Sequence, residues 1–186
     1  MCGLTPGSCG RRGQRTMFSV LHWPAPHSQT VVQHNGGDAL NTKEASGIEL
    51  LRAMKEGKIP YPSIADTVPM RFTELEIGSI KCVIKADSRH INPLGGVHGG
   101  FAATVLDSVT GCAIHTMLEA GVGYGTVDIN IKMMRPIPLN EELQAEGRVL
   151  NLSKNLGVSE GFIKDADGKL YAHATSTCLI LRGAAA

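Results

Sequence analysis

The chain has 186 residues, of which 42% are hydrophobic and 19% charged, and its formal net charge is +1. These values are typical of a globular protein, and the length suits one domain with a substantial core. The near-neutral chain has no basic stripe interleaved with aromatic residues, so nucleic-acid binding is not indicated. No apolar run reaches the roughly 18–20 residues that cross a bilayer, so we expect no membrane span.

The cysteines and histidines bear on compartment and on metal binding. The five cysteines are odd in number and form no C-x-x-C pair, which favours free thiols, a reducing compartment and hence a cytoplasmic protein. The seven histidines show no H-x-x-x-H spacing on one helix, so we predict no metal site.

The N-terminal part differs in composition from the rest. Residues 1–37 contain three arginines and no acidic residue, with many Gly, Pro, Ser and Gln. Organelle-targeting segments also lack acids, and Met17 offers an internal start, but a poorly ordered extension is the simpler interpretation. We therefore predict an extension over 1–41 and a folded domain over 42–182.

A short helix is predicted over 42–58, capped by Thr42 or Asn41 and stopped by Pro60 and Pro62. The pattern then changes to the two-residue period of strands. Two strands are predicted next, over 68–76 and 80–87, with a turn at 77–79. A loop over 88–98 leads into a long helix from Gly99 to Glu119, and a flexible glycine-rich connection follows over 121–125. Four more strands are predicted over 126–134, 143–154, 158–164 and 169–182, and a hairpin turn at 165–168 joins the last two.

This order of elements predicts an α+β domain in which one long helix lies against a curved antiparallel sheet of five to six strands. In the strand over 80–87, Ile80, Cys82 and Ile84 share one face, so Cys82 is expected in the core. In the strand over 126–134, the alternation places Val127 on the apolar face and Thr126 on the polar one, so Thr126 reaches a site on the apolar face only if the start of the strand twists or bulges.

The long helix carries one acid, Asp107, before its last residue. Its apolar residues surround most of the circumference, so we expect it to be buried on most sides. A carboxylate in that position costs several kcal/mol unless it is paired or neutralised. Asp107 is therefore the leading candidate for a functional residue.

Gly99 and Gly100 fall in the first turn of this helix, where backbone amides have no partner within the helix. A bare amide there suits a carbonyl oxygen that becomes an oxyanion. A plain glycine-rich helix entrance is the more common use of such residues.

Gly99 and Asp107 are eight residues apart, which is roughly 12 Å along one helix. A reacting group must lie within about 3–3.5 Å of the atom that it attacks. If both residues act on one carbonyl, two antiparallel copies of the helix are needed, so we expect a symmetric dimer with its sites at the interface.

Three blocks of sequence carry a recognisable pattern: Asn92-Pro93-x-Gly95-x-x-His98-Gly99-Gly100 with Ala103-Thr104-x-x-Asp107 and Gly111, then Thr126-Val127-Asp128-x-Asn130 with Arg135-Pro136, then Ala145-Glu146-Gly147-Arg148 with Asp167-Gly168. Over roughly residues 45–182 the chain resembles the hotdog-fold acyl-CoA thioesterases of the PaaI type. That resemblance implies a hotdog fold, an acyl-CoA substrate and a homodimer that is often paired again into a tetramer. CoA belongs to the substrate, so no separate cofactor is expected.

The resemblance also assigns roles to residues. Asp107 would be the nucleophile or the general base that activates water, with Thr126 near it. The Gly99 amide would polarise the thioester carbonyl, and Asn92 would orient water or bind that carbonyl. His98 would orient the loop or contact substrate, although it may equally bond only the loop backbone.

Four residues are assigned to CoA. Gly100 would assist Gly99, and Arg135 has a guanidinium that suits a phosphate. Lys154 and Asn155 would flank the pantetheine entrance.

Two other functions stay open at this point. One is a non-catalytic module that binds or senses acyl-CoA on the same fold. The other is a hotdog dehydratase or hydratase, although such enzymes pair a His with an acid in a different loop arrangement. The one G-x-S-x-G match, Gly157 to Gly161, falls in the strand predicted over 158–164 rather than at a strand-to-helix turn, so there is no nucleophile elbow, which argues against a Ser-His-Asp hydrolase.

Overall fold

Six strands and one long helix make up most of residues 41–182, the part of the chain that the computed structural model describes. The extension predicted over 1–41 therefore lies outside the described residues, apart from residue 41 itself. The strands form one sheet in the order β1-β2-β4-β5-β6-β3, and every neighbouring pair is antiparallel. The strands are β1 (Met70–Glu76), β2 (Ser79–Lys85), β3 (Val122–Met133), β4 (Glu142–Leu152), β5 (Leu156–Lys164) and β6 (Leu170–Arg182).

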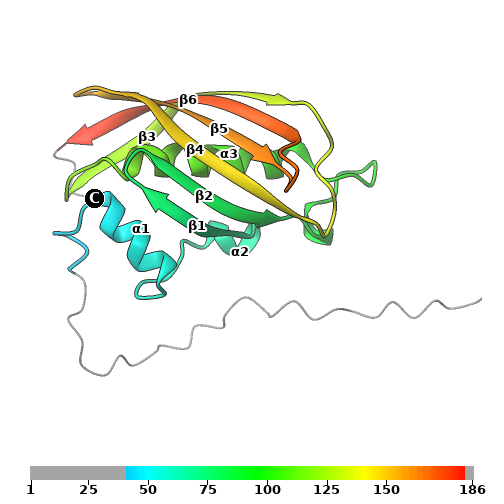
Figure 1. Cartoon of the computed structure of the whole chain (residues 1–186), viewed down its shortest axis with the longest axis horizontal. Coiled ribbons are helices and arrows are strands. Elements are labelled where there is room, and N and C mark those ends of the chain that lie inside the picture. The colour runs from blue at the N-terminus through cyan, green and yellow to red at the C-terminus, as the bar shows by residue number, and fades with distance from the viewer. Residues whose placement is uncertain (1–40, 183–186) are drawn as a thin grey trace, which may run out of the picture. The chain divides into compact units, whose positions relative to one another are not determined.

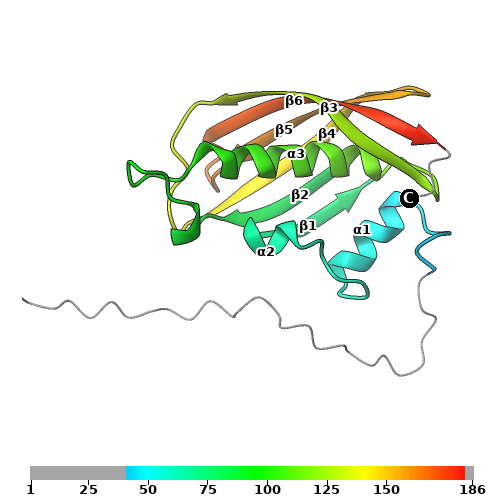
Figure 2. The ribbon, with the colours of Figure 1, turned by 180° about the vertical axis from the view of Figure 1, so that it is seen from behind.

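Helix α3 (Gly99–His115) lies against one face of this sheet. Figure 1 shows the sheet from its outer face with α3 behind it, and Figure 2 shows α3 in front. The prediction of a hotdog fold, with a curved antiparallel sheet around a central helix, is confirmed. The helix ends earlier than predicted, where the Thr116 hydroxyl donates to the Ala113 carbonyl at 2.6 Å and accepts from the Gly78 amide at 2.7 Å.

Strand β3 follows α3 in the chain but lies at the far edge of the sheet from β1, because α3 carries the chain across the sheet. The prediction that 121–125 is a flexible connection is wrong, since Val122 and the next residues already belong to β3. They pair with the end of β6, for example Tyr124 with Ile180. This pairing outweighs the weak strand preference of the glycines.

The predicted first helix is shorter than expected. Helix α1 spans Gly47–Lys55 and begins at Ser46 rather than at residue 41 or 42. The backbone amide and hydroxyl of Ser46 both donate to the Glu49 carboxylate, at 2.8 and 2.6 Å, which forms a capping box. A single helical turn, α2 (Ile64–Thr67), was not predicted and follows Pro62.

Paired glycines let α3 approach the sheet closely. Gly147 of β4 and Gly161 of β5 face each other in the strand register. A Cβ atom at Gly147 would lie 2.1 Å from the carbonyl oxygen of Val109 in α3, and one at Gly161 would lie 2.9 Å from a methyl of Thr110. The helix backbone therefore rests where these two strands have no side chains.

The core is aliphatic and follows the predicted period of two. Ile80, Cys82 and Ile84 are each 1% exposed and face α3, as expected. Cys82, Cys112 and Cys178 are all free thiols. No helix in the described part of the chain is both long and apolar enough to cross a membrane.

Candidate active site

The sheet covers one side of α3, and the opposite side is only partly covered in the single chain, which leaves it open at Asp107. Val105, Leu106 and Val109 are buried against the sheet, whereas Asp107 is exposed. The prediction that α3 is buried on most sides is confirmed, since Asp107 is the one exposed residue of the helix, but the prediction of a desolvated carboxylate is wrong for the single chain. The physical reason is that one curved sheet reaches only part of the helix circumference.

A cavity of about 280 Å³ opens beside Asp107. Its lining from α1, α2, β1 and the segment between the two helices is largely apolar, and it includes Leu51, Met54, Tyr61, Ile64, Met70 and Phe72. Its lining from α3 and β3 is mostly polar, and it includes Asp107, Ser108, Cys112, His115, Tyr124 and Thr126. The cavity thus joins a carboxylate to an apolar chamber, the combination found in small-molecule sites.

Thr126 reaches this cavity because β3 contains a bulge. Thr126 pairs with Cys178 and Asp128 with Thr177, so Val127 has no partner in β6. The extra residue reverses the alternation and turns Thr126 toward α3, while Val127 is 62% exposed. The predicted faces of Thr126 and Val127 are therefore wrong, and the predicted placement of Thr126 near the acid agrees with the cavity lining.

Tyr124 was not recognised in the sequence as a site residue. It lies two residues before Thr126 on the same face of β3, and its ring rests on Gly111 of α3, where a Cβ atom would be 2.7 Å from Cε2. Its hydroxyl lies beside the Cys112 thiol, which also lines the cavity. The available signal was an aromatic residue between two glycines at the strand spacing from Thr126.

Burial keeps the neighbours of Tyr124 uncharged. It raises the pKa of the Cys112 thiol to about 11, despite the opposing effect of the neighbouring Tyr124 hydroxyl. Burial lowers the pKa of His115, whose ring centroid lies 5.4 Å from that of Tyr124. Since a thiolate is the nucleophilic form of cysteine, Asp107 is better suited than Cys112 to attack a substrate in this cavity.

The first turn of α3 leaves one amide available. His98 caps the helix, and its Nδ1 accepts from the Gly100 amide at 2.8 Å. Within residues 41–182 the Gly99 amide meets no hydrogen-bond acceptor. The sulfur of Met133 lies against Gly99, 2.8 Å from the position that a Cβ would take. The single chain thus satisfies Gly100 and leaves Gly99 with a bare N–H.

Asn92 holds the loop before α3 in shape. Its Oδ1 accepts from the amides of Leu94 at 2.9 Å and Gly96 at 3.2 Å, and its backbone also bonds Gly96 at 2.8 Å. The side-chain NH₂ of Asn92 has no acceptor among the described residues, so it is the group left to meet a substrate or water. The loop projects from the end of the sheet with Leu94 95% exposed.

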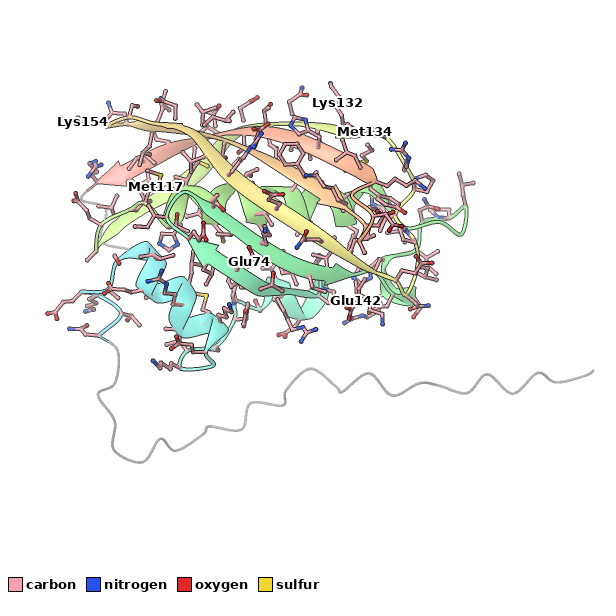
Figure 3. The ribbon with its side chains drawn as sticks, in the orientation of Figure 1. Glu74, Met117, Lys132, Met134, Glu142 and Lys154 are labelled. Carbon is pink, nitrogen blue, oxygen red and sulfur yellow. The ribbon has the colours of Figure 1, made fainter. Side chains whose placement is uncertain are left out.

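The residues assigned to CoA lie at two ends of the molecule. Arg135 follows β3, and its guanidinium donates to the carbonyl of Leu170. Lys154 and Asn155 form the β4–β5 turn, where their carbonyls accept from Arg182 and the backbone of Ile180. Figure 3 shows Lys154 at one end of the sheet and Met134, next to Arg135, at the other.

The single chain therefore brings together only part of the predicted site. Asp107 and Thr126 line one cavity, whereas His98 and Gly100 line a second one of about 370 Å³ at the start of α3. Within the described residues, no group of three His, Cys, Asp or Glu side chains is arranged to hold a metal ion.

Comparisons with known proteins identify the family of this chain. The sequence pattern of the thioesterase superfamily matches residues 94–172, which include Gly99, Asp107 and Thr126. Acyl-coenzyme A thioesterase 13 of Homo sapiens is 34% identical over 101 residues, which are 54% of this chain and 71% of that protein.

Solved structures give the same result. A putative thioesterase of Ralstonia eutropha, described as related to phenylacetic acid degradation, superposes with a TM-score of 0.64 at 30% identity, over 69% of this chain and 98% of that one. The PaaI protein of E. coli superposes with a TM-score of 0.62 at 19% identity, over 71% of this chain and 91% of that one, and shows the shared fold. The chain therefore belongs to the thioesterase superfamily, as a PaaI-like hotdog thioester hydrolase.

Proposed function

We propose that the substrate is an acyl-CoA, which the enzyme hydrolyses to a free acid and CoA with Asp107 as the attacking or activating group. The observation that carries this proposal is the position of Asp107 and Thr126 on the lining of the 280 Å³ cavity, which we call the acyl cavity. The acyl group would enter the apolar chamber, and its carbonyl carbon would stop at the carboxylate. The chemistry assigned to acyl-coenzyme A thioesterase 13 by its name supports the same substrate class.

A thioester needs little help to react, because its carbonyl is electrophilic and its thiolate is a good leaving group. In the general-base route, Asp107 takes a proton from water while the water oxygen attacks the carbonyl carbon. The C–S bond then breaks, and CoA leaves as a thiolate that takes up a proton. In the covalent route, the Asp107 carboxylate attacks the carbonyl carbon first, the C–S bond breaks and CoA leaves as a thiolate, and water then hydrolyses the resulting anhydride to the free acid and the Asp107 carboxylate. The Thr126 hydroxyl would hold the carboxylate or the water.

The oxyanion would be stabilised by the Gly99 amide of a second copy of the chain. Within one helix, Gly99 and Asp107 stand roughly 12 Å apart, too far for both to act on one carbonyl. An antiparallel second copy on the open side of α3 would place its Gly99 beside Asp107 and would withdraw Asp107 from solvent. We therefore propose a homodimer with shared sites, with a dimer of dimers as a further step.

The remaining assignments follow from that arrangement. Asn92 would use its NH₂ group to orient the water or the carbonyl, and His98 would fix the start of α3 by accepting from Gly100. Arg135 of one copy and Lys154 and Asn155 of another would meet the CoA moiety, since one copy holds them at opposite ends. We propose no cofactor beyond the CoA of the substrate.

The test is CoA release from a panel of acyl-CoAs by the wild-type enzyme and by Asp107→Asn and Asp107→Ala. We expect turnover to fall by at least ~100-fold in both variants. Asp128→Asn is the matched control, because Asp128 is exposed on the other face of β3 beyond the bulge, and it should stay near wild-type activity. Full activity in both Asp107 variants would reject this residue as the reacting group.

A further inference from the structure

Tyr124 is the largest side chain that β3 contributes to the acyl cavity. It lies two residues from Thr126 on the same face of β3, which is roughly 7 Å along an extended strand. An acyl group whose carbonyl sits at Thr126 and Asp107 would therefore meet the tyrosine ring beyond its first few carbon atoms.

Three contacts hold the ring in one place. The ring packs directly on the backbone of Gly111, where a Cβ atom would lie 2.7 Å from Cε2 and 3.1 Å from the hydroxyl oxygen. The Cys112 thiol lies beside that hydroxyl. His115 packs against the ring at a centroid distance of 5.4 Å and an interplanar angle of 47°. A ring fixed by three neighbours on α3 acts as a wall rather than as a flexible lid.

The size of the cavity sets what can lie beside this wall. An apolar cavity of about 150 Å³ is large enough for benzene, and the acyl cavity, at about 280 Å³, is nearly twice that size. It fits roughly an aryl ring with a short linker, or a straight chain of medium length. Met54 and Met70 line the cavity as well, and their flexible side chains adapt to either shape.

We propose that Tyr124 is the specificity-determining residue of this enzyme, and that its ring limits the length of the acyl group that the cavity accepts. This inference rests on the proposed acyl-CoA hydrolysis at Asp107. Replacing the ring by a small side chain would open the cavity between β3 and the Gly111 turn of α3. Longer acyl groups would then be accommodated.

The experiment measures kcat/KM for a series of straight-chain substrates from acetyl-CoA to palmitoyl-CoA, together with phenylacetyl-CoA. In Tyr124→Ala we expect the preference to move to longer chains, with the ratio of palmitoyl-CoA to hexanoyl-CoA rising at least ~10-fold, since each further buried methylene contributes to discrimination. Tyr124→Leu, which keeps an apolar side chain, should move the ratio in the same direction and serves if the alanine variant does not fold.

Two matched variants complete the design. Tyr124→Phe keeps the ring and loses only the hydroxyl, so its chain-length profile should equal that of the wild type. Phe162→Ala truncates a ring of similar size on the outer face of the sheet, where Lys164 lies 4.6 Å from the ring centroid, and should also leave the profile unchanged. A folded Tyr124→Ala or Tyr124→Leu protein with the wild-type profile would overturn the inference.

A binding measurement separates this inference from the proposed function. Non-hydrolysable thioether analogues of the same acyl-CoAs report chain-length preference by calorimetry without turnover. If the wild type releases no CoA from any substrate, the proposed hydrolysis fails. Affinities that rank by chain length, with a ranking that shifts in Tyr124→Ala, would still support a role for Tyr124 in limiting acyl-group length. A ranking that does not shift would refute that role.

Discussion

The hydroxyl oxygen of Thr126 lies 3.6 Å from the sulfur of Cys178, across the β3–β6 pair. This contact exists because Val127 bulges out of the register and turns Thr126 toward α3. Without the bulge, Thr126 would face the same way as Asp128, on the outer face of the sheet. A single unpaired residue therefore decides whether a hydroxyl reaches the proposed site.

Thr126→Val is expected to lower kcat by up to about tenfold, because it removes one hydrogen bond that contributes roughly 0.5–1.5 kcal/mol. The valine has the same shape, so the melting temperature should change little. The double variant Thr126→Val/Val127→Thr moves the hydroxyl by one position to the outer face. Its kcat should equal that of the single variant, and recovery of activity would show that the bulge does not control which hydroxyl acts.

Gly99→Pro is expected to lower kcat by about 100- to 1,000-fold, the usual effect of losing one oxyanion donor. Proline removes the N–H, and it is tolerated at the first helical position, which Gly99 occupies. Gly99→Ala is the control, since it meets the same sulfur of Met133 but keeps the N–H. It should lose much less activity than Gly99→Pro.

Mixing the inactive Gly99→Pro and Asp107→Asn proteins should restore CoA release. In a mixed dimer one site pairs both altered residues, and the other pairs an intact Asp107 with an intact Gly99. Activity after subunit exchange would require shared sites, whereas inactive mixtures of exchanged subunits would contradict the shared-site dimer.

Gly147→Ala is expected to destabilise the fold by at least about 2 kcal/mol, because the new methyl would lie 2.1 Å from the Val109 carbonyl and the backbone of α3 would have to move. Gly123→Ala is the control, since a Cβ there would meet only the Cβ of Leu181, at 3.9 Å. Urea unfolding of both variants measures the difference. Equal midpoints would mean that α3 can withdraw from β4 at little cost.

The outer face of the sheet carries a pH-sensitive cluster around Glu160. Partial burial raises the pKa of Glu160, but hydrogen bonds from Arg148 at 2.6 Å and His173 at 3.3 Å outweigh it and leave that pKa below its ordinary value. A depressed folded-state pKa gives stability that is present above the unfolded pKa of about 4.3 and is lost as pH falls through the folded value.

We therefore expect the urea concentration at the unfolding midpoint of the wild type to decrease as the pH drops below about 4.3. The midpoint of Glu160→Gln should decrease less steeply over the same pH range. Glu76→Gln, which changes an acid at the end of β1, should retain the wild-type slope. Identical slopes for wild type and Glu160→Gln would show that this carboxylate does not contribute to acid sensitivity.

Much of the fold could be predicted from the sequence, because periodicity and breakers are local properties. The alternation of Ile80, Cys82 and Ile84 predicts a half-buried strand, and the structure confirms it. The glycines at 99 and 100 predict the start of the long helix at the correct residue. The fold class follows from the order of these elements together with the resemblance of the Asn92 to Asp107 block.

Part of the candidate site was also contained in the sequence. Asp107 was identified as the only acid before the last residue of a mostly apolar helix, and Gly99 as a bare amide at its start. Thr126 was predicted near the acid from the resemblance alone. These assignments depend on residue types at fixed separations, and the amino-acid sequence contains both.

Other properties were decided only by tertiary structure. The exposure of Asp107 in one chain depends on how far a curved sheet extends around α3. The side on which Thr126 points depends on a bulge, which arises from pairing between β3 and β6 and leaves no mark in the local alternation. Tyr124 lines the cavity because its ring lies against Gly111 of α3. The two residues come together only when α3 and β3 pack against each other. Local patterns determine which elements form, and packing between elements determines which side chains meet.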